Sequence, residues 1–396
     1  TGEVESYIMA KELVSKYFEE GTYAEIEKVN PKDLEGKEYE PLFDFYKGKV
    51  KKAWIVCLAD FVSTEDGTGV VHIAPAFGED DYNLSLEHGI DGIHHVGMDG
   101  NFKDEVKPWA GKFVKNMDQN IADDLAERGL LLKKENYKHS YPHCWRCDTP
   151  LLNYSTKSLF IKVTDVKERL LSNNKKIHWQ PEHIKDGRFG KWLDGARDWA
   201  ISRNRFWGCP IPVWECECGE QICIGSIEEL KESAVGGKLP MRKGEVDLHK
   251  PYIDEIYVKC EKCGRSAKRI PDVLDCWFES GSMPYAQLHY PHENKEDFEN
   301  NFPAHFIAEG VDQTRGWFYT LHVLSTILFD EPAFFNVIVN GILLAADGEK
   351  LSKRKKNYPD PMELFDAKGV DSMRYFLYSS TAPLAEDVRF SESHVE

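Results

Sequence analysis

Residues 303–346 have the sequence PAHFIAEGVDQTRGWFYTLHVLSTILFDEPAFFNVIVNGILLAA, and this pattern sets the architecture of the surrounding chain. Short apolar runs at 306–308 and 335–344 predict buried strands, and the segment 314–329 between them predicts a helix. A strand, a helix and a strand in this order form a β-α-β unit of a parallel sheet. The ligand crevice of such a sheet lies at the carboxyl ends of its strands, so Glu309, Gly310 and the loop 347–354 are the first candidates for chemistry.

The loop after the second predicted strand, Asp347-Gly-Glu-Lys-Leu-Ser-Lys-Arg-Lys-Lys, carries five basic residues among its ten. A basic loop alone is weak evidence, because solvated turns of this kind are common. At this edge of a sheet, however, flexible lysines can neutralise charge that develops as pyrophosphate leaves. The loop resembles the KMSKS signature of class I aminoacyl-tRNA synthetases, with Leu351 in place of Met. The resemblance implies that Lys353 supports the transition state of amino-acid activation, beside Lys350 and Ser352.

Three longer stretches narrow the resemblance to the isoleucyl-tRNA synthetase family. They are PDVLDCWFESGSMPYAQ at 271–287, IAEGVDQTRGWF at 307–318 and DWAISRNRFWG at 198–208. The runs GSMPYAQ and DQTRGW are more similar to this family than to the related valyl enzymes. The run Asn340-Gly-Ile and the Ser-Lys-Arg ending of the lysine-rich loop resemble archaeal or eukaryotic members.

The resemblance also assigns roles around the predicted sheet. It implies that four residues after the first strand hold the aminoacyl-adenylate and that two tryptophans form the walls of the isoleucine pocket. Carboxylates suit an α-ammonium or a ribose hydroxyl, and aromatic walls suit a branched alkyl group. Either tryptophan alone is more often a core residue, and His305 departs from the aspartate that is commoner in the family. The six residues are Glu309, Gly310, Asp312 and Gln313 for the adenylate, and Trp277 and Trp317 for the pocket.

Six of the ten cysteines stand in close pairs, which indicates metal binding rather than disulfides. Cys216 and Cys218 precede one glycine, and Cys260 and Cys263 precede another. Two such pairs bracketing a loop have the spacing of a tetrahedral zinc site with four cysteine ligands. Because C-x-C is tighter than the usual C-x-x-C, Cys223 is an alternative ligand.

The third pair, Cys144 and Cys147, has no second pair left to complete a site. In the family that it resembles, the partners of this pair lie upstream, so the resemblance implies half of a second zinc site. His143 is a poor substitute ligand because it has the character of a turn residue.

The first part of the chain alternates apolar and polar residues at 52–58 and 69–73, which predicts a β-rich domain. Apolar residues at helical intervals predict a helix over 118–132. The sequence TEDGTGVVHIAPAFGEDDY at 64–82 means little alone. Compared with the family, it resembles an editing pocket in which Asp81 holds the α-ammonium of a mischarged aminoacyl end. There His72 shapes the wall that excludes isoleucine, and Thr68 and Asp80 are neighbours.

A physical limit explains why such a pocket is needed. One methylene is worth only about 1 to 3 kcal/mol of discrimination, and isoleucine against valine in this enzyme family is the standard example. Hydrolysis in a second pocket needs a positioned water more than a nucleophilic side chain. The sequence shows no Ser-His-Asp or Cys-His arrangement, which agrees with that expectation.

Together these observations predict an α/β protein: the second half of a class I nucleotide-binding, Rossmann-like parallel sheet, with a β-rich editing insertion and a zinc-stapled connector. The His-Ile-Gly-His element of the family does not occur in the sequence. We therefore expect an internal part of a longer chain that also contributes a Thr-rich editing strand and an anticodon-binding domain. The predicted segments are editing domain 1–139 (incomplete at its start), return connector 140–200, zinc segment 201–275, catalytic half-domain with the lysine loop 276–380, and link 381–396.

The composition fits this hypothesis. The formal net charge is −17, so contacts with nucleic acid must come from local basic patches. Without a membrane segment or signal peptide, the sequence predicts a cytoplasmic monomer within a longer chain. The expected ligands are tRNA(Ile), isoleucine, ATP with magnesium, and zinc. Two alternatives remain: a free-standing aminoacyl-tRNA deacylase and a non-catalytic zinc-containing RNA-binding module. Neither accounts for the strand followed by the lysine loop.

Overall fold

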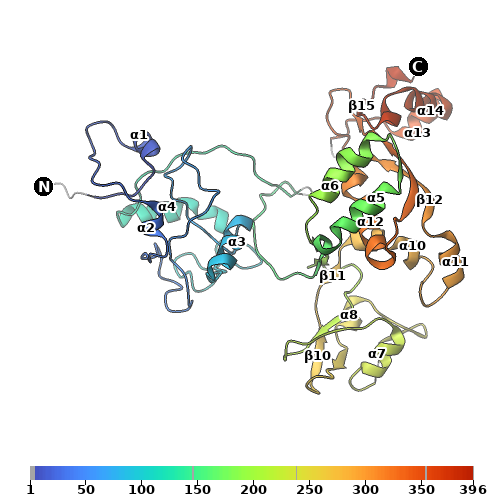
Figure 1. Ribbon diagram of the computed structural model, residues 1–396, viewed down its shortest axis with the longest axis horizontal. Helices are drawn as coiled ribbons and strands as arrows, with labels where there is room; N and C mark the ends of the chain where they lie inside the picture. Colours follow the sequence, from blue (N-terminus) through green and yellow to red (C-terminus); the bar gives the residue numbers. More distant parts are fainter. Residues whose placement is uncertain (1–4, 145–146, 238, 353–354, 396) are drawn as a thin grey trace. The chain divides into compact units, whose positions relative to one another are not determined.

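The computed structural model describes residues 5–144, 147–237, 239–352 and 355–395 (Figure 1). The chain divides into two compact units, Thr1–Lys157 and Ser158–Glu396. The finer division into five segments stays a prediction.

The first unit consists of short helices joined by turns and extended segments. Its small apolar core contains Val96, Phe102, Val106 and Trp109. Phe43 and Phe45 stack on one another and meet the Trp109 ring edge-on, so aromatic contacts supply much of this core. Its helical elements are η1 Lys11–Leu13, α1 Val14–Tyr17, α2 Pro31–Leu34, α3 Glu79–His88, η2 Val114–Asn116 and α4 Asp118–Glu127.

The β-rich prediction for this unit is not matched by its described residues, which contain isolated bridges such as Glu38 with Ile55 but no β-strand. Within the 52–58 run only 54–56 pairs, with 36–39, and the left-handed φ of 54° at Trp54 prevents the extended backbone from continuing toward residue 52. In the 69–73 run, Val70 and Val71 are more than half exposed. The helix predicted over 118–132 is confirmed as the shorter α4.

The second unit is built on a three-stranded parallel sheet in the order β12-β13-β2. Strands β12 (Ala304–Gly310) and β13 (Phe334–Asn340) confirm the predicted parallel unit, and β2 (His178–Gln180) adds a strand that the sequence did not suggest. Trp179, Phe189, Phe318 and Phe334 interlock beneath the sheet and are almost completely buried. This aromatic core fixes the sheet on which the candidate site stands.

Helix α12 (Trp317–Phe329) connects the two parallel strands. It is apolar along most of its length, and the residues from Phe318 to Thr326 are all buried. The helix was predicted to start near Thr314, but a 3₁₀ turn, η5 (Val311–Arg315), comes first. The Gln313 side chain accepts a hydrogen bond from the Trp317 backbone N–H at 2.9 Å, at a helix start that lies three residues later than expected.

A separate antiparallel sheet has the order β6-β5-β10-β9. Trp214, Val258 and Ala267 lie in its core, and the Trp214 indole N–H donates to the Ile256 carbonyl oxygen at 2.7 Å. This core keeps together two loops that carry cysteines. The strands are β5 Val213–Glu215, β6 Gln221–Cys223, β9 Tyr257–Lys259 and β10 Ser266–Arg269.

The remaining elements of the second unit surround these two sheets. Helices α5, α6 and α12 lie together against the parallel sheet (Figure 1). The helical elements are η3 Val163–Val166, α5 Lys167–Lys175, the π-helical turn η4 Lys185–Phe189, α6 Gly190–Asp194, α7 Ile227–Ser233, α8 Lys250–Ile253, α9 Cys276–Gly281, α10 Met283–Ala286, α11 Lys295–Asn301, α13 Pro361–Lys368, α14 Val370–Ser379, η6 Ala382–Leu384 and η7 Glu392–His394. The strands are β1 Phe160–Ile161, β3 Trp199–Ala200, β4 Ser202–Arg203, β7 Met241–Arg242, β8 Glu245–Val246, β11 Val273–Leu274, β14 Leu343–Leu344 and β15 Val388–Arg389.

Candidate functional site

The residues predicted to bind adenylate lie at the carboxyl end of β12. Glu309 and Gly310 are its last two residues and pair with Val339 and Asn340 of β13. Asp312 and Gln313 follow in η5. The structure therefore gathers all four at one edge of the parallel sheet, where a ligand crevice is expected.

Of the two tryptophans predicted to form the pocket, Trp277 has its ring next to Gly316, and Trp317 follows this glycine directly in the chain. A Cβ built on Gly316 would lie 2.7 Å from Gln313 Oε1 and 3.0 Å from the nearest atom of the Trp277 ring. The Trp317 indole N–H donates to the Ser280 carbonyl oxygen at 2.9 Å, which joins α12 to α9. Trp277 remains 40% exposed, so its ring presents apolar surface to a ligand. Gly316 is needed here because any side chain would push these groups apart.

The η4 turn, which the sequence did not suggest as functional, supports η5. Arg188 Nε donates to Thr314 Oγ1 at 2.9 Å, and this hydroxyl donates to the Val311 carbonyl oxygen at 2.7 Å. The Arg315 guanidinium lies 4.9 Å from the centre of the Trp192 ring. These contacts fix the turn that carries Asp312 and Gln313. No sequence spacing could have indicated them, because the partners lie far apart in the chain.

The lysine-rich loop is closed by Asn357. Its side-chain oxygen accepts from the Ser352 backbone N–H at 2.8 Å, and its amide donates to the Lys350 carbonyl oxygen at 3.2 Å. The loop thus holds two of its three predicted catalytic residues in one turn. Lys353, the third, lies outside the described residues, and so does Arg354.

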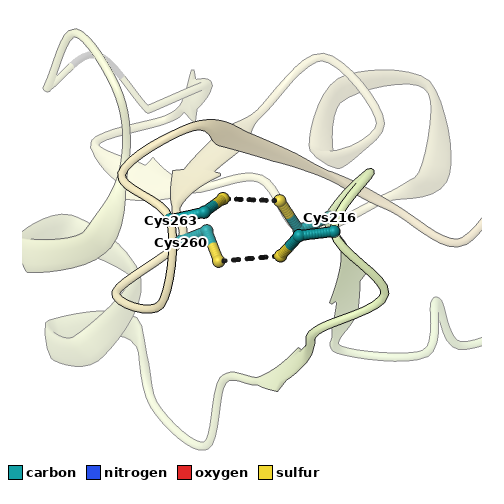
Figure 2. A group of neighbouring side chains, drawn as sticks. Cys216, Cys260 and Cys263 are labelled. Atoms are coloured by element: carbon teal, nitrogen blue, oxygen red, sulfur yellow. Dashed lines mark hydrogen bonds between the residues drawn. The ribbon is translucent and has the colours of Figure 1, made fainter.

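The four predicted metal ligands form one group. The sulfur atoms of Cys216, Cys218, Cys260 and Cys263 all lie within 4.8 Å of one another. The Cys216 and Cys263 sulfurs are 3.4 Å apart, and those of Cys218 and Cys260 are 3.8 Å apart. Figure 2 shows the sulfurs of the three labelled cysteines turned toward one another. Zn–S bonds of about 2.3 Å in a tetrahedron place sulfurs about 3.8 Å apart, so this donor set fits zinc.

The charges in this cluster also favour a cation. The Arg265 backbone N–H and then its guanidinium lower the pKa of Cys263 to about 6. The Cys218 backbone N–H favours the Cys216 thiolate, but burial and the neighbouring sulfurs outweigh it and raise the pKa of Cys216 to about 12. Four thiolates so close together repel one another, and a bound metal cation relieves that repulsion.

The remaining cysteine predictions have different outcomes. Cys223 lies on β6 outside the four-sulfur group. Among the described residues, no third potential ligand joins Cys144 and Cys147. The Cys147 sulfur instead lies 3.0 Å from Thr149 Oγ1, and the hydrogen bonds from Thr149 lower the pKa of Cys147. His143 Nδ1 lies 2.9 Å from the Tyr141 carbonyl oxygen, and His143 forms an isolated antiparallel bridge with Pro150, so it is a bridge residue rather than the expected turn residue.

The predicted editing residues lie on one segment of the first unit. Asp81, in the first turn of α3, accepts a hydrogen bond from the Ala74 backbone N–H at 3.0 Å and folds the preceding loop onto the helix. A Cβ on Gly78 would lie 2.8 Å from the accepting oxygen, so only glycine leaves room for this contact. Thr68 Oγ1 donates to the Val70 carbonyl oxygen at 3.1 Å. These partners are local backbone groups.

His72 and Asp80 are exposed on the same segment. His72 lies close enough to His95 to affect it: burial lowers the pKa of His95, and the charges of His72, His94 and Lys103 add to the effect. All four predicted editing residues are described, and the structure records no hydrogen bond among their side chains. Their convergence on one pocket stays a prediction.

Comparison with known proteins decides the family. Residues 18–391 match the family described as tRNA synthetases class I (I, L, M and V). The chain belongs to the class I tRNA synthetases. This membership confirms the predicted fold class, in which a parallel sheet is accompanied by a separate antiparallel sheet and a cysteine cluster.

Several relatives of this class I synthetase chain carry the name isoleucine–tRNA ligase. The protein from Treponema denticola is 52% identical over 98% of this chain and 36% of its own length. Those from Clostridium acetobutylicum and Protochlamydia amoebophila are each 51% identical over 99% of this chain and 37% of their own lengths. The chain therefore spans little more than a third of these relatives.

These relatives are bacterial, so the expected archaeal or eukaryotic character is not supported. That expectation rested on two short runs, Asn340-Gly-Ile and the end of the lysine loop. Sequence identity to bacterial relatives over nearly the whole class I synthetase chain outweighs them. Within the described ranges, no helix combines the length and apolar character that crossing a bilayer requires.

Proposed function

We propose that the chain forms part of an isoleucine–tRNA ligase, which activates isoleucine with magnesium-bound ATP, transfers it to tRNA(Ile) and hydrolyses mischarged valyl-tRNA(Ile). One observation carries the proposal: shortly after the carboxyl end of the parallel strand β12, the Trp277 ring and Gln313 both border Gly316, which Trp317 follows. An apolar aromatic wall next to polar groups suits an aliphatic amino acid whose polar end must be held.

At the activation site, each group has a role that its chemistry supports. The Glu309 carboxylate and the Asp312 carboxylate can bind the α-ammonium or the ribose hydroxyls, with Gly310 and Gln313 holding the adenylate backbone between them. The tryptophans enclose the branched side chain. Lys350, Ser352 and Lys353 contact the phosphates and neutralise the charge that develops as pyrophosphate leaves.

In the editing reaction, Asp81 binds the α-ammonium of the mischarged residue. One of its oxygens accepts from Ala74, and for the other the structure records no hydrogen bond among the described residues. His72 forms the wall that rejects isoleucine, with Thr68 and Asp80 beside it. In this proposal His72→Ala opens the pocket, so that correctly charged isoleucyl-tRNA is also hydrolysed.

The four-cysteine cluster holds one zinc ion, which joins the β5-β6 turn to the β9-β10 turn. When bound, zinc supplies cross-linking in a closed site with four sulfur ligands rather than catalysis. The chain's own contribution is to present the sulfurs. Turns closed by Gly219 N–H to Cys216 O at 2.8 Å and by Gly264 N–H to Cys260 O at 2.7 Å shape the two halves.

The test uses a full-length enzyme carrying this sequence and measures exchange of labelled pyrophosphate into ATP. We expect isoleucine to support exchange better than valine. Trp277→Ala should lower kcat/KM for isoleucine at least about tenfold, because it removes an aromatic wall of the pocket. Tyr375→Ala, which removes a ring that is 76% exposed on α14, is the matched control. Absence of isoleucine-dependent exchange, or equal activity of the two variants, would contradict the proposal.

A further inference from the structure

Asp275 is a buried carboxylate that has no role in either proposed reaction site. It is 4% exposed and directly precedes α9, the helix that carries Trp277. Burial of a carboxylate costs free energy unless hydrogen bonds replace the lost water, so buried charges are normally paired. The groups that pair with Asp275 therefore show which parts of the fold its charge holds together.

The two carboxylate oxygens of Asp275 bind different parts of the second unit. Oδ2 accepts from the Trp199 indole N–H at 3.1 Å and from the Arg203 guanidinium at 2.8 Å. Oδ1 accepts from the Trp277 backbone N–H at 3.3 Å, in the first turn of α9. One side chain thus joins the segment that contains β3 and β4 to the start of the helix that presents Trp277.

The segment that contains β3 and β4 is itself firmly held. Arg203 also donates to the Ala200 and Ser202 carbonyl oxygens at 2.8 and 2.9 Å, and β4 pairs with β11 immediately before Asp275. The Asp275 backbone N–H donates to the Ile201 carbonyl oxygen at 2.7 Å. Hydrogen-bonded networks in which the buried groups have partners are rigid, so this segment is a fixed anchor for the carboxylate.

The other end of α9 is fixed against α12. A Cβ built on Gly281 would lie 2.9 Å from the backbone carbonyl carbon of Thr320, so the two helices touch at this point. Trp277 lies between this contact and Asp275 in the chain, and its ring borders Gly316. Because α9 has only six residues, a shift of its first turn is passed directly to the Trp277 ring.

We propose that Asp275 is a positioning residue that fixes the Trp277 ring as a wall of the amino-acid pocket. Its charge holds the start of α9 against the Trp199 and Arg203 donors, so the pocket keeps the width that separates isoleucine from valine. One methylene gives only about 10- to 200-fold discrimination, so a small outward shift of the ring removes much of it. The part of the inference that concerns isoleucine rests on the proposed function, whereas the placement of the ring does not.

Pyrophosphate exchange by a full-length enzyme carrying this sequence tests the effect on the pocket. Asp275→Asn replaces one accepting oxygen by an amide group that cannot accept, so the contacts with Trp277, Trp199 and Arg203 can no longer all be kept. We expect KM for isoleucine to rise about tenfold with kcat changed less than about twofold, and the preference for isoleucine over valine to fall about fivefold. Trp199→Phe, which removes one donor and keeps a ring beside Phe278, should raise KM about threefold.

A merely structural role of Asp275 predicts a different kinetic result. The folded fraction would fall, so kcat would decrease while KM stayed unchanged. Asp360→Asn is the matched control, because Asp360 also caps a helix, α13, by accepting from the Met362 backbone N–H at 2.8 Å. This variant changes an equivalent cap on another helix and should leave KM for isoleucine unchanged.

The position of the ring is measured separately from activity, by fluorine-19 NMR of the 396-residue chain labelled with 5-fluorotryptophan. Trp277→Phe identifies the Trp277 signal among those of the ten tryptophans. Asp275→Asn and Trp199→Phe should both shift this signal, and Asp360→Asn should leave it in place. An unmoved signal in the Asp275→Asn chain would overturn the proposal, and so would a KM for isoleucine within about twofold of that of the unchanged enzyme. If the unchanged full-length enzyme shows no isoleucine-dependent exchange, the proposed function fails, and the NMR shift alone decides whether Asp275 positions the ring.

Discussion

Two segments of the chain carry the same C-x-x-C spacing in different surroundings. Cys260 and Cys263 lie between β9 and β10, and the β5-β6 turn brings two more sulfurs to them. Cys144 and Cys147 lie in the first unit, where the described residues supply no further ligand. The comparison teaches that the same cysteine spacing joins a four-sulfur group where a second folded turn delivers the other two sulfurs.

The same contrast separates the two candidate reaction sites. Around β12, predicted residues from distant segments lie close together: the Trp277 ring and Gln313 both border Gly316, and the Trp317 indole N–H donates to the Ser280 carbonyl oxygen. In the first unit, Asp81 and Thr68 instead bond to nearby backbone. The candidate activation site is therefore built by long-range packing, whereas the predicted editing residues are set by the local shape of one loop.

The largest expected effect is on zinc content and tests whether the two cysteine pairs differ in metal binding. The purified chain should retain about one tightly bound zinc after dialysis, as measured by elemental analysis. Cys260→Ser should abolish it, because the remaining three sulfurs no longer close the tetrahedron. Cys144→Ser should leave the zinc content unchanged. Two full equivalents in the unchanged chain would mean that the second pair also forms a site.

The next prediction concerns the predicted editing residue Asp81 and is tested in a full-length enzyme. Asp81→Ala should slow deacylation of valyl-tRNA by about one to two powers of ten, since a charge-assisted hydrogen bond is worth about 1.5 to 3 kcal/mol. Isoleucine activation should not change. Asp81→Asn tests the charge separately, because the amide oxygen of the asparagine can still accept the hydrogen bond from the Ala74 backbone N–H but carries no charge.

The two Asp81 variants distinguish a catalytic role from a structural one. If the charge matters, both lose deacylation, and only Asp81→Ala also loses stability. If Asp81 merely holds the loop, Asp81→Asn keeps both deacylation and melting temperature, and the editing role is refuted.

A smaller effect is expected at the close contact in the second unit. Gly316→Ala should cost about 1 to 3 kcal/mol in packing, because its methyl would press on Gln313 and Trp277. Activation of isoleucine should fall about tenfold while deacylation is kept. Gly187→Ala is the control, since its Cβ would meet nothing within 4 Å. Parallel loss of both reactions would show general unfolding instead.

The smallest expected effect is on the pH dependence of the free energy of unfolding. His322 is fully buried, and burial lowers its pKa to about 4, well below the ordinary value of 6.5. The unfolded chain therefore binds a proton that the folded chain excludes, so stability is present above pH 6.5 and is lost as pH falls toward 4. The slope from this residue is at most about 1.4 kcal/mol per pH unit. Urea unfolding at several pH values should show it, and His322→Gln should flatten it.

Sequence patterns predicted the parts of the second unit that depend on local periodicity. The β12-α12-β13 order belongs to this class, whereas the four sulfurs were predicted from cysteine spacing and are brought together by two turns far apart in the chain. The helix start was placed too early because apolar periodicity does not register the 3₁₀ turn η5 and the non-helical backbone at Gly316, which precede the hydrogen bond from Trp317 to Gln313. The support of η5 by Arg188 was missed because it joins distant segments. In the first unit, alternation at 52–58 did not reveal that Trp54 takes a left-handed backbone.

The order of strands in the parallel sheet has a consequence for folding during synthesis. Strand β2 emerges early, but its partner β13 is made only after the antiparallel cysteine sheet and β12. The cysteine sheet pairs strands within one compact region and can fold as soon as its last strand appears. Trp179 of β2 can meet Asn174 and Phe189 early, but its burial is completed only by Phe318 and Phe334, which are made much later. This closure is slow because a long loop must be ordered first. The nascent chain therefore needs protection from association during this interval, after the cysteine sheet has formed and before the parallel sheet closes.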